Sequence, residues 1–154
     1  MKKATKLVLT LFMAISLLGC GGEPKNFEVG GEPKNFEAEV KLPLSVKKGD
    51  EFVIVVKVNN TAAEQQNLVA IDIADTYLEG IAILRTEPNP HEEAVHIPNV
   101  GTSYMFDLPV GAGEQKLIKF YAKAVKQGDY NSQIDFWVET EFNFFSKFIR
   151  TIVE

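Results

Sequence analysis

The sequence predicts an all-β protein: an antiparallel sandwich of about seven to eight strands, preceded by an N-terminal leader and a flexible linker. Apolar and polar residues alternate with period two from Phe36 onward, which is typical of half-buried strands. Turns rich in Gly, Asn and Asp separate the alternating segments. The chain has 154 residues, 45% of them apolar, which is enough for one domain with one hydrophobic core.

The first twenty residues have the pattern of a signal peptide. Lys2, Lys3 and Lys6 precede an apolar run from Leu7 to Leu18. As a helix that run would rise about 18 Å, well short of the ~30 Å hydrocarbon core of a bilayer. The pattern therefore indicates a cleaved leader and not a membrane span.

The leader ends in Leu17-Leu18-Gly19-Cys20, which resembles the bacterial lipobox, in which the cysteine is joined to lipid and the chain is cut just before it. The resemblance implies a lipoprotein signal peptide over residues 1–19 and acyl chains such as palmitate on Cys20, which would anchor the protein in a membrane. Because Gly21 follows in place of Asp, it points to the outer membrane in a Gram-negative host, and otherwise to the outer face of the cell membrane. A plain secretory signal with an incidental cysteine is the alternative.

Residues 20–35 are predicted to be a tether. Residues 21–29 read GGEPKNFEV and residues 30–38 read GGEPKNFEA, so eight of nine positions are identical. Gly pairs, Pro and alternating charges give no apolar face to bury, which is typical of a linker. A repeat that binds something is the alternative, although repeat folds normally need three or more units.

Residues 36–154 are predicted to form the sandwich. The expected strands before the Pro-rich middle of the chain lie at Phe36–Lys47, Phe52–Val58, Val69–Ile73 and Ile81–Ile83. Those after it lie at Tyr104–Leu108, Ile118–Ala124 and Tyr130–Glu139. The last segment, Phe142–Val153, is apolar on both sides, and its aromatic and β-branched content favours a strand over the alternative of an amphipathic helix.

Two stretches of this domain resemble known modules. Gly111–Val138, reading GAGEQKLIKFYAKAVKQGDYNSQIDFWV, is similar to the closing strands of bacterial immunoglobulin-like modules such as the cell-adhesion-related bacterial domain. Lys48-Gly49-Asp50, with VIVVKVNNT soon after it, resembles their second strand. The resemblance implies an immunoglobulin-like sandwich that binds or spaces other molecules, on a fold that hosts many functions. Tyr130 stands where such folds place a tyrosine corner; a plain core aromatic is the alternative.

Composition and motifs offer little for catalysis. Acidic residues outnumber Lys and Arg by 21 to 16, which argues against a nucleic-acid partner. The segment His91–His96 spaces its histidines five apart, whereas a zinc-protease helix needs a spacing of four, and Pro90 and Pro98 bracket it. A solvated loop is therefore predicted, with weak metal binding as the alternative.

Three carboxylates form a second candidate metal site. Asp72, Asp75 and Glu79 could hold Ca²⁺ at an edge of the sandwich, but three carboxylates on a turn are more often solvated. No catalytic residue, metal or cofactor is predicted.

The last two strands are expected to expose an apolar patch. A three-residue loop at Thr140-Glu141-Phe142 would set Asp135 opposite Lys147 and Trp137 opposite Phe145, with Ile149 on the same outward face. Trp137, Phe145 and Ile149 are therefore predicted to bind a partner. Two alternatives remain: a loop over Thr86–Gly101 covers Trp137, or a two-residue turn puts a different set outside, namely Phe142, Phe144, Phe148 and Ile152.

Together these expectations describe a lipid-anchored, extracytoplasmic, non-enzymatic binding or scaffolding module of the bacterial cell envelope. Its partners would be the membrane, through the N-terminal lipid, and a protein or glycan. One alternative is an accessory subunit docked permanently on another envelope protein or on a second copy of itself. Another is a metal-binding protein or enzyme that uses the His91–His96 loop.

Overall fold

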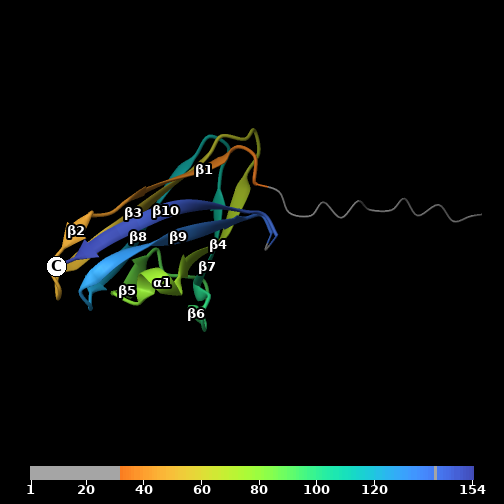
Figure 1. Ribbon diagram of the computed structural model, residues 1–154. Coiled ribbons are helices and arrows are strands. Elements are labelled where there is room, and N and C mark those ends of the chain that lie inside the picture. Colours follow the sequence, from red (N-terminus) through yellow and green to blue (C-terminus); the bar gives the residue numbers. More distant parts are fainter. Residues whose placement is uncertain (1–31, 141) are drawn as a thin grey trace, which may run out of the picture.

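The computed structural model describes residues 32–140 and 142–154, which fold into two β-sheets packed face to face (Figure 1). One sheet has four strands in the order β1-β3-β8-β5, and the other has six in the order β2-β10-β9-β4-β7-β6. The predicted all-β sandwich is confirmed, with ten strands where about seven to eight were expected. The predicted signal peptide, Cys20 and tether residues 20–31 lie outside the described residues.

The strands follow the alternation of the sequence. The four-stranded sheet contains β1 (Phe36–Lys41), β3 (Glu51–Asn60), β5 (Ile81–Glu87) and β8 (Gln115–Ala124). The six-stranded sheet contains β2 (Ser45–Val46), β4 (Gln66–Ala74), β6 (Val95–Ile97), β7 (Gly101–Val110), β9 (Gly128–Val138) and β10 (Phe144–Val153). A single helical turn, α1 (Asp75–Leu78), joins β4 to β5, and the alternation does not predict it. The described part of the chain has no helix long and apolar enough to cross a membrane.

The strand order is immunoglobulin-like. In such sandwiches strands A, B, E and D form one sheet, and strands G, F and C lie side by side in the other. Here β1-β3-β8-β5 reproduces the first set and β10-β9-β4 the second, with β2 paired in parallel to β10. β7 and β6 extend the second sheet beyond β4, although β5 precedes both of them in the chain.

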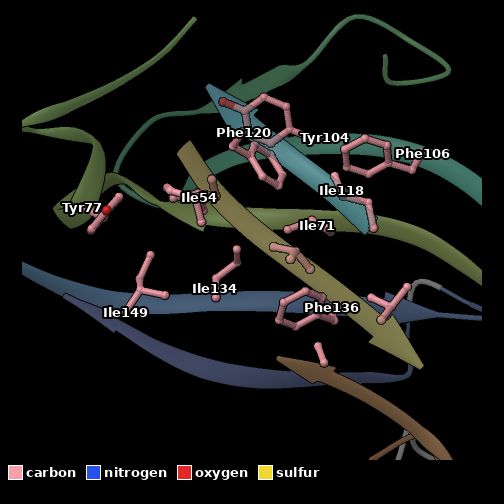
Figure 2. Close-up of a cluster of buried hydrophobic side chains, with 14 of the residues drawn as sticks. Ile54, Ile71, Tyr77, Tyr104, Phe106, Ile118, Phe120, Ile134, Phe136 and Ile149 are labelled. Atoms are coloured by element: carbon pink, nitrogen blue, oxygen red, sulfur yellow. The ribbon is translucent and has the colours of Figure 1, made fainter. Parts of the chain in front are cut away.

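The core lies between the sheets and consists of the inward residues of the longer strands together with Tyr77 of α1. Figure 2 shows this cluster, in which the labelled residues are Ile54, Ile71, Tyr77, Tyr104, Phe106, Ile118, Phe120, Ile134, Phe136 and Ile149. Tyr104 and Phe106 of β7 meet Phe120 of β8 edge to face, with ring centroids 5.2 and 6.0 Å apart. Aromatic contacts of this kind hold the two sheets in one relative position.

The first predicted strand, Phe36–Lys47, is in fact two strands in different sheets. β1 pairs with β3, whereas β2 pairs with β10. Pro43 lies between them, and because proline has no N–H it cannot continue a β-ladder. The chain changes sheet here, so Leu44, expected in the core, is 62% exposed. The buried Thr151 hydroxyl fastens the crossing: it donates to the carbonyl of Pro43 (3.2 Å) and bonds the Tyr77 hydroxyl (2.9 Å).

A β-bulge changes which residues of β4 face the core. The alternation of the sequence places Val69, Ile71 and Ile73 on one side of this strand, which predicts that all three face the core. The register shifts between Leu68 and Ala70, so Leu68 is fully buried and Val69 only partly. A bulge adds one residue to one strand and so reverses the alternation on one side of it. Ile71 and Ile73 remain in the core as predicted.

The last segment is a strand, and the helix alternative is wrong. β10 pairs with β9 so that Phe144 is opposite Trp137 and Ser146 is opposite Asp135. This register differs by one residue from the expected pairing of Trp137 with Phe145. The N–H of Val138 donates to the carbonyl of Asn143 (2.9 Å), a pairing that the expected three-residue loop does not produce.

The shifted register reverses the faces of β10, which corrects the predicted partner-binding set. Phe145 is 7% exposed and Ile149 is 1% exposed, and both belong to the core. Phe145 stacks on Phe136 with ring centroids 5.1 Å apart, and Figure 2 shows Ile149 in the core cluster. The outward residues of β10 are those of the alternative register, with Phe144 and Phe148 exposed.

Tyr130 forms the predicted tyrosine corner. Its hydroxyl donates to the backbone carbonyl of Gln127 at 3.0 Å, and its ring is buried. The ring passes so close to Gly80 that a Cβ atom there would lie 2.0 Å from two of its carbons. Position 80 therefore needs glycine because no space is left for a side chain.

Replacing Tyr130 by Phe tests the corner. The ring stays in place and one hydrogen bond is lost, so the free energy of unfolding should fall by about 1 kcal/mol. Tyr121→Phe is a matched control, since the Tyr121 hydroxyl donates to the exposed Glu87 carboxylate (2.8 Å). Urea unfolding measures both variants, and equal losses in the two would contradict a special role for the corner.

Candidate functional site

The outward face of the six-stranded sheet carries aromatic side chains that the core does not use. Phe148 is 67% exposed and Phe144 is 44% exposed. Phe144 packs beside the half-buried Trp137, with ring centroids 4.6 Å apart and planes inclined by 32°. We define the Trp137 face as the outward residues around this pair on β4, β7, β9 and β10, namely Ala70, Asp72, Ser103, Met105, Asp135, Trp137, Phe144 and Phe148.

The strand register arranges part of this face in two rows. Ala70 pairs with Trp137 on one side and Met105 on the other, which forms the first row. Because Ala70 is small, it leaves space between the two larger side chains. The second row lies beside the first and consists of Asp135, Asp72 and Ser103.

The space over Ala70 is a hollow of ≈ 250 Å³. Its lining residues are Val69, Ala70, Asp72, Ser103, Met105 and Trp137. Val69 belongs to the bulge of β4, and bulges often redirect side chains beside functional sites. Trp137 contacts Phe144 and also lines the hollow, whereas Phe144 does not line it. The indole therefore has one surface packed on Phe144 and another that faces the hollow.

A hydrogen bond to Asp72 fixes the indole. Trp137 Nε1 donates to Asp72 Oδ2 at 2.8 Å, whereas Asp72 Oδ1 is buried and has no hydrogen-bond partner within the described residues. Burial raises the pKa of the Asp72 carboxyl above its usual value, and the negative charge of Asp135 adds to the rise; the adjacent Ser103 hydroxyl, which itself donates to Met105 Sδ (3.8 Å), and the indole N–H oppose it. Asp72 is therefore a carboxylate whose charge the fold does not fully compensate.

In the part of the chain that the structure describes, neither carboxylate of the Trp137 face forms an ion pair. The ion pairs found within residues 32–140 and 142–154 involve other acids. Arg150, on the outward side of β10, already donates two hydrogen bonds to Asp129, from Nε (2.8 Å) and Nη2 (2.6 Å). Asp135 accepts only a neutral hydrogen bond, from the Ser146 hydroxyl at 2.5 Å. The face therefore combines aromatic rings with negative charge.

The structure supports one of the three predicted partner-binding positions as a surface residue. Trp137 lies on the Trp137 face, whereas Phe145 and Ile149 do not. The segment over residues 86–101 is the alternative cover for Trp137. It runs along the edge of β7 that is away from β4, where the N–H of His91 donates to the carbonyl of Met105 (2.7 Å). It contributes no lining residue to the hollow.

The His91–His96 segment lies elsewhere and is not wholly a loop, because its end belongs to the short strand β6. His96 Nδ1 is 3.5 Å from Asp75 Oδ1 and 3.2 Å from Thr102 Oγ1. Asp75, Glu79 and His96 line an open groove of ≈ 640 Å³ beside α1. In the described ranges, no three His, Cys, Asp or Glu side chains gather closely enough to hold a metal ion.

Sequence reasoning missed the role of Asp72, which it grouped with Asp75 and Glu79. Asp72 alternates with the core residues Ile71 and Ile73, so its outward direction was readable. Its partner Trp137 is 65 positions away, on a neighbouring strand that only the sheet order identifies.

Asp72→Asn should stabilise the protein at neutral pH. Asparagine keeps an oxygen for the indole N–H and removes a partly buried charge beside Asp135, so the free energy of unfolding should rise by about 1 kcal/mol. Because the pKa of Asp72 is raised in the folded protein, the native state binds more protons than the unfolded chain at pH values between the usual Asp pKa and the raised one. The free energy of unfolding of the wild type therefore falls as the pH rises through this range.

The gain should therefore be full at about pH 7 and absent at about pH 3, where the carboxyl is protonated in both states. Urea unfolding at both values measures it. Glu37→Gln, at an exposed position of β1, is the charge-matched control. A gain of equal size at both pH values, or a loss at neutral pH, would show that the Asp72 charge is not the cause.

No protein-family model matches the chain, and no curated protein sequence does either. Among solved structures, the CARDB domain of a Pyrococcus furiosus protein is similar with a TM-score of 0.46 and 13% identity, over 76% of this chain and 87% of that chain. A PapD-like domain of human CEP192 has a TM-score of 0.45 and 8% identity, over 98% of both chains.

A third similar structure is an alkylpurine DNA glycosylase of Pseudomonas fluorescens, with a TM-score of 0.41 and 16% identity over 77% of this chain. This chain spans 30% of the length of that enzyme. These similarities concern the β-sandwich alone. The immunoglobulin-like fold is established by the strand order given above.

Proposed function

We propose that the protein is a non-enzymatic binding or scaffolding module of the bacterial cell envelope, held on the extracytoplasmic side by lipid on Cys20, and that the Trp137 face contacts a protein or glycan partner. The observation that carries this proposal is the exposure of Phe144 and Phe148 around Trp137, on a sheet face that the core does not need. Exposed aromatic patches commonly mark interfaces, and Trp is frequent among binding hot spots.

The place where the N-terminal segment joins the domain is consistent with this arrangement. Glu32 lines a second hollow, of ≈ 310 Å³, together with Val138, Glu139 and Asn143, which flank the turn between β9 and β10. Trp137 and Phe144 form the pair next to that turn. A tether from Cys20 would therefore limit the distance between the membrane and this end of the Trp137 face. The limit is the length of the extended tether, roughly 3.1 Å per residue.

The anchor has a direct test. Cys20→Ala should leave a precursor that keeps residues 1–19 and takes up no radioactive palmitate, because the acceptor thiol is gone. Mass spectrometry of the purified N-terminus and acyl labelling in growing cells give the two readouts. A variant that is still cut after Gly19 and labelled as strongly as the wild type would overturn the lipid anchor.

The binding face is tested by crosslinking and pull-down from native membranes. Trp137→Ala and Phe148→Ala should each reduce capture of the partner about tenfold, a loss typical of a hot-spot side chain. Leu117→Ala is the matched control, since Leu117 is 56% exposed but belongs to the four-stranded sheet. Melting temperatures separate binding from folding: unfolding of Trp137→Ala, or equal capture by Phe148→Ala and the control, would contradict the proposed face.

A further inference from the structure

We propose that the hollow beside Trp137 receives an arginine side chain of a protein partner, with the guanidinium lying against the indole and facing the carboxylate of Asp72, to which the neighbouring Asp135 adds a second negative charge. This inference rests on the proposed function, because it specifies what the Trp137 face recognises. It makes the partner a protein and leaves a glycan as an outcome of the test.

The charge of the hollow calls for a cation. Asp72 and Asp135 are directly opposite each other on β4 and β9, a placement in which like charges are destabilising. Arg150 is occupied by Asp129, and the other ion pairs of the described residues involve different acids. A guanidinium in the hollow would relieve the repulsion between the two aspartates.

The hydrogen-bond inventory points the same way. Asp72 Oδ2 is used by the Trp137 indole, but Asp72 Oδ1 is buried without a partner among the described residues. A buried acceptor that makes no hydrogen bond destabilises the fold. The Asp72 carboxylate lines the hollow and has acceptor capacity left for an N–H donor, and arginine offers five such donors in a planar fork.

The apolar walls select the kind of cation. Trp137 and Met105 flank the hollow, which at ≈ 250 Å³ has room for one long side chain and not for an extended surface. A guanidinium is planar and weakly hydrated, so it stacks on an aromatic ring better than an ammonium does.

The protein already contains one such arrangement. Arg85 lies over the ring of Tyr121 with Cζ 3.4 Å from the ring centroid, and the Tyr121 hydroxyl donates to the Glu87 carboxylate. In that cluster an aromatic ring, bonded through its polar hydrogen to a carboxylate, holds an arginine of the same chain. Trp137 and Asp72 form the equivalent ring and carboxylate, without the arginine.

Trp137 reports on its own site, because it is the only tryptophan of the chain. The full-length lipoprotein in detergent micelles is titrated with the peptide acetyl-Gly-Arg-Gly-amide while indole fluorescence is recorded. The citrulline peptide, which has the same shape without the charge, is the ligand control. A chitobiose titration tests the glycan alternative.

The arginine peptide should give a saturable change at millimolar concentration, and the citrulline peptide should bind at least about tenfold more weakly. Asp72→Asn should weaken the arginine peptide by a similar factor, although this variant is expected to be at least as stable as the wild type. Glu37→Gln removes the same charge from the other sheet and should leave the titration unchanged.

Equal binding of both peptides, equal effects of Asp72→Asn and Glu37→Gln, or saturation by chitobiose alone would each overturn the arginine site. These failures are distinguishable from failure of the proposed function. If native-membrane capture still depends on Trp137 and Phe148 while Asp72→Asn captures the partner normally, the face binds a partner but not through an arginine.

Discussion

The register between β9 and β10 is the constraint on which both the core and the surface of this protein depend. Side chains of a strand alternate between two faces, so a slip of one residue would exchange every side chain of β10 between inside and outside. In the observed register Phe145 stacks on Phe136 in the core, and Phe144 packs on Trp137 outside it. Because both faces of β10 are apolar, hydrophobicity does not choose between the two registers; the turn between the strands and the fit of the aromatic pairs do.

The strands that alternate cleanly could be predicted from sequence, because their burial is decided locally. Ile118, Phe120, Ala122 and Ala124 of β8 are all fully buried, as the period-two pattern of that segment predicts. The same reasoning failed where another part of the fold decides. The chain changes sheet at Pro43 and Leu44 is exposed, although the alternation of apolar and polar residues in the sequence continues through both positions.

The candidate site was harder to predict than the fold for the same reason. The sequence identified Trp137 as a surface aromatic but paired it with Phe145, because register depends on turn length. Asp72 was read with its sequence neighbours, since nothing local links it to a tryptophan 65 positions away. The hollow itself depends on the small side chain of Ala70 meeting two strands at once, which requires the order β9-β4-β7.

The pairing of β1 determines how the proposed module would respond to mechanical load. In the proposed lipid-anchored module, a load on the tether would enter β1 at Phe36, which pairs with Asn60 of β3. The component of such a load that runs along the axis of β1 would shear the ladder from Phe36 to Lys41, so its hydrogen bonds would bear that component together. Behind β1, the hydroxyl of Thr151 holds the crossing at Pro43. Because forced unfolding is governed by the unfolding rate, this six-residue strand and its crossing would set the lifetime of the anchored domain under tension.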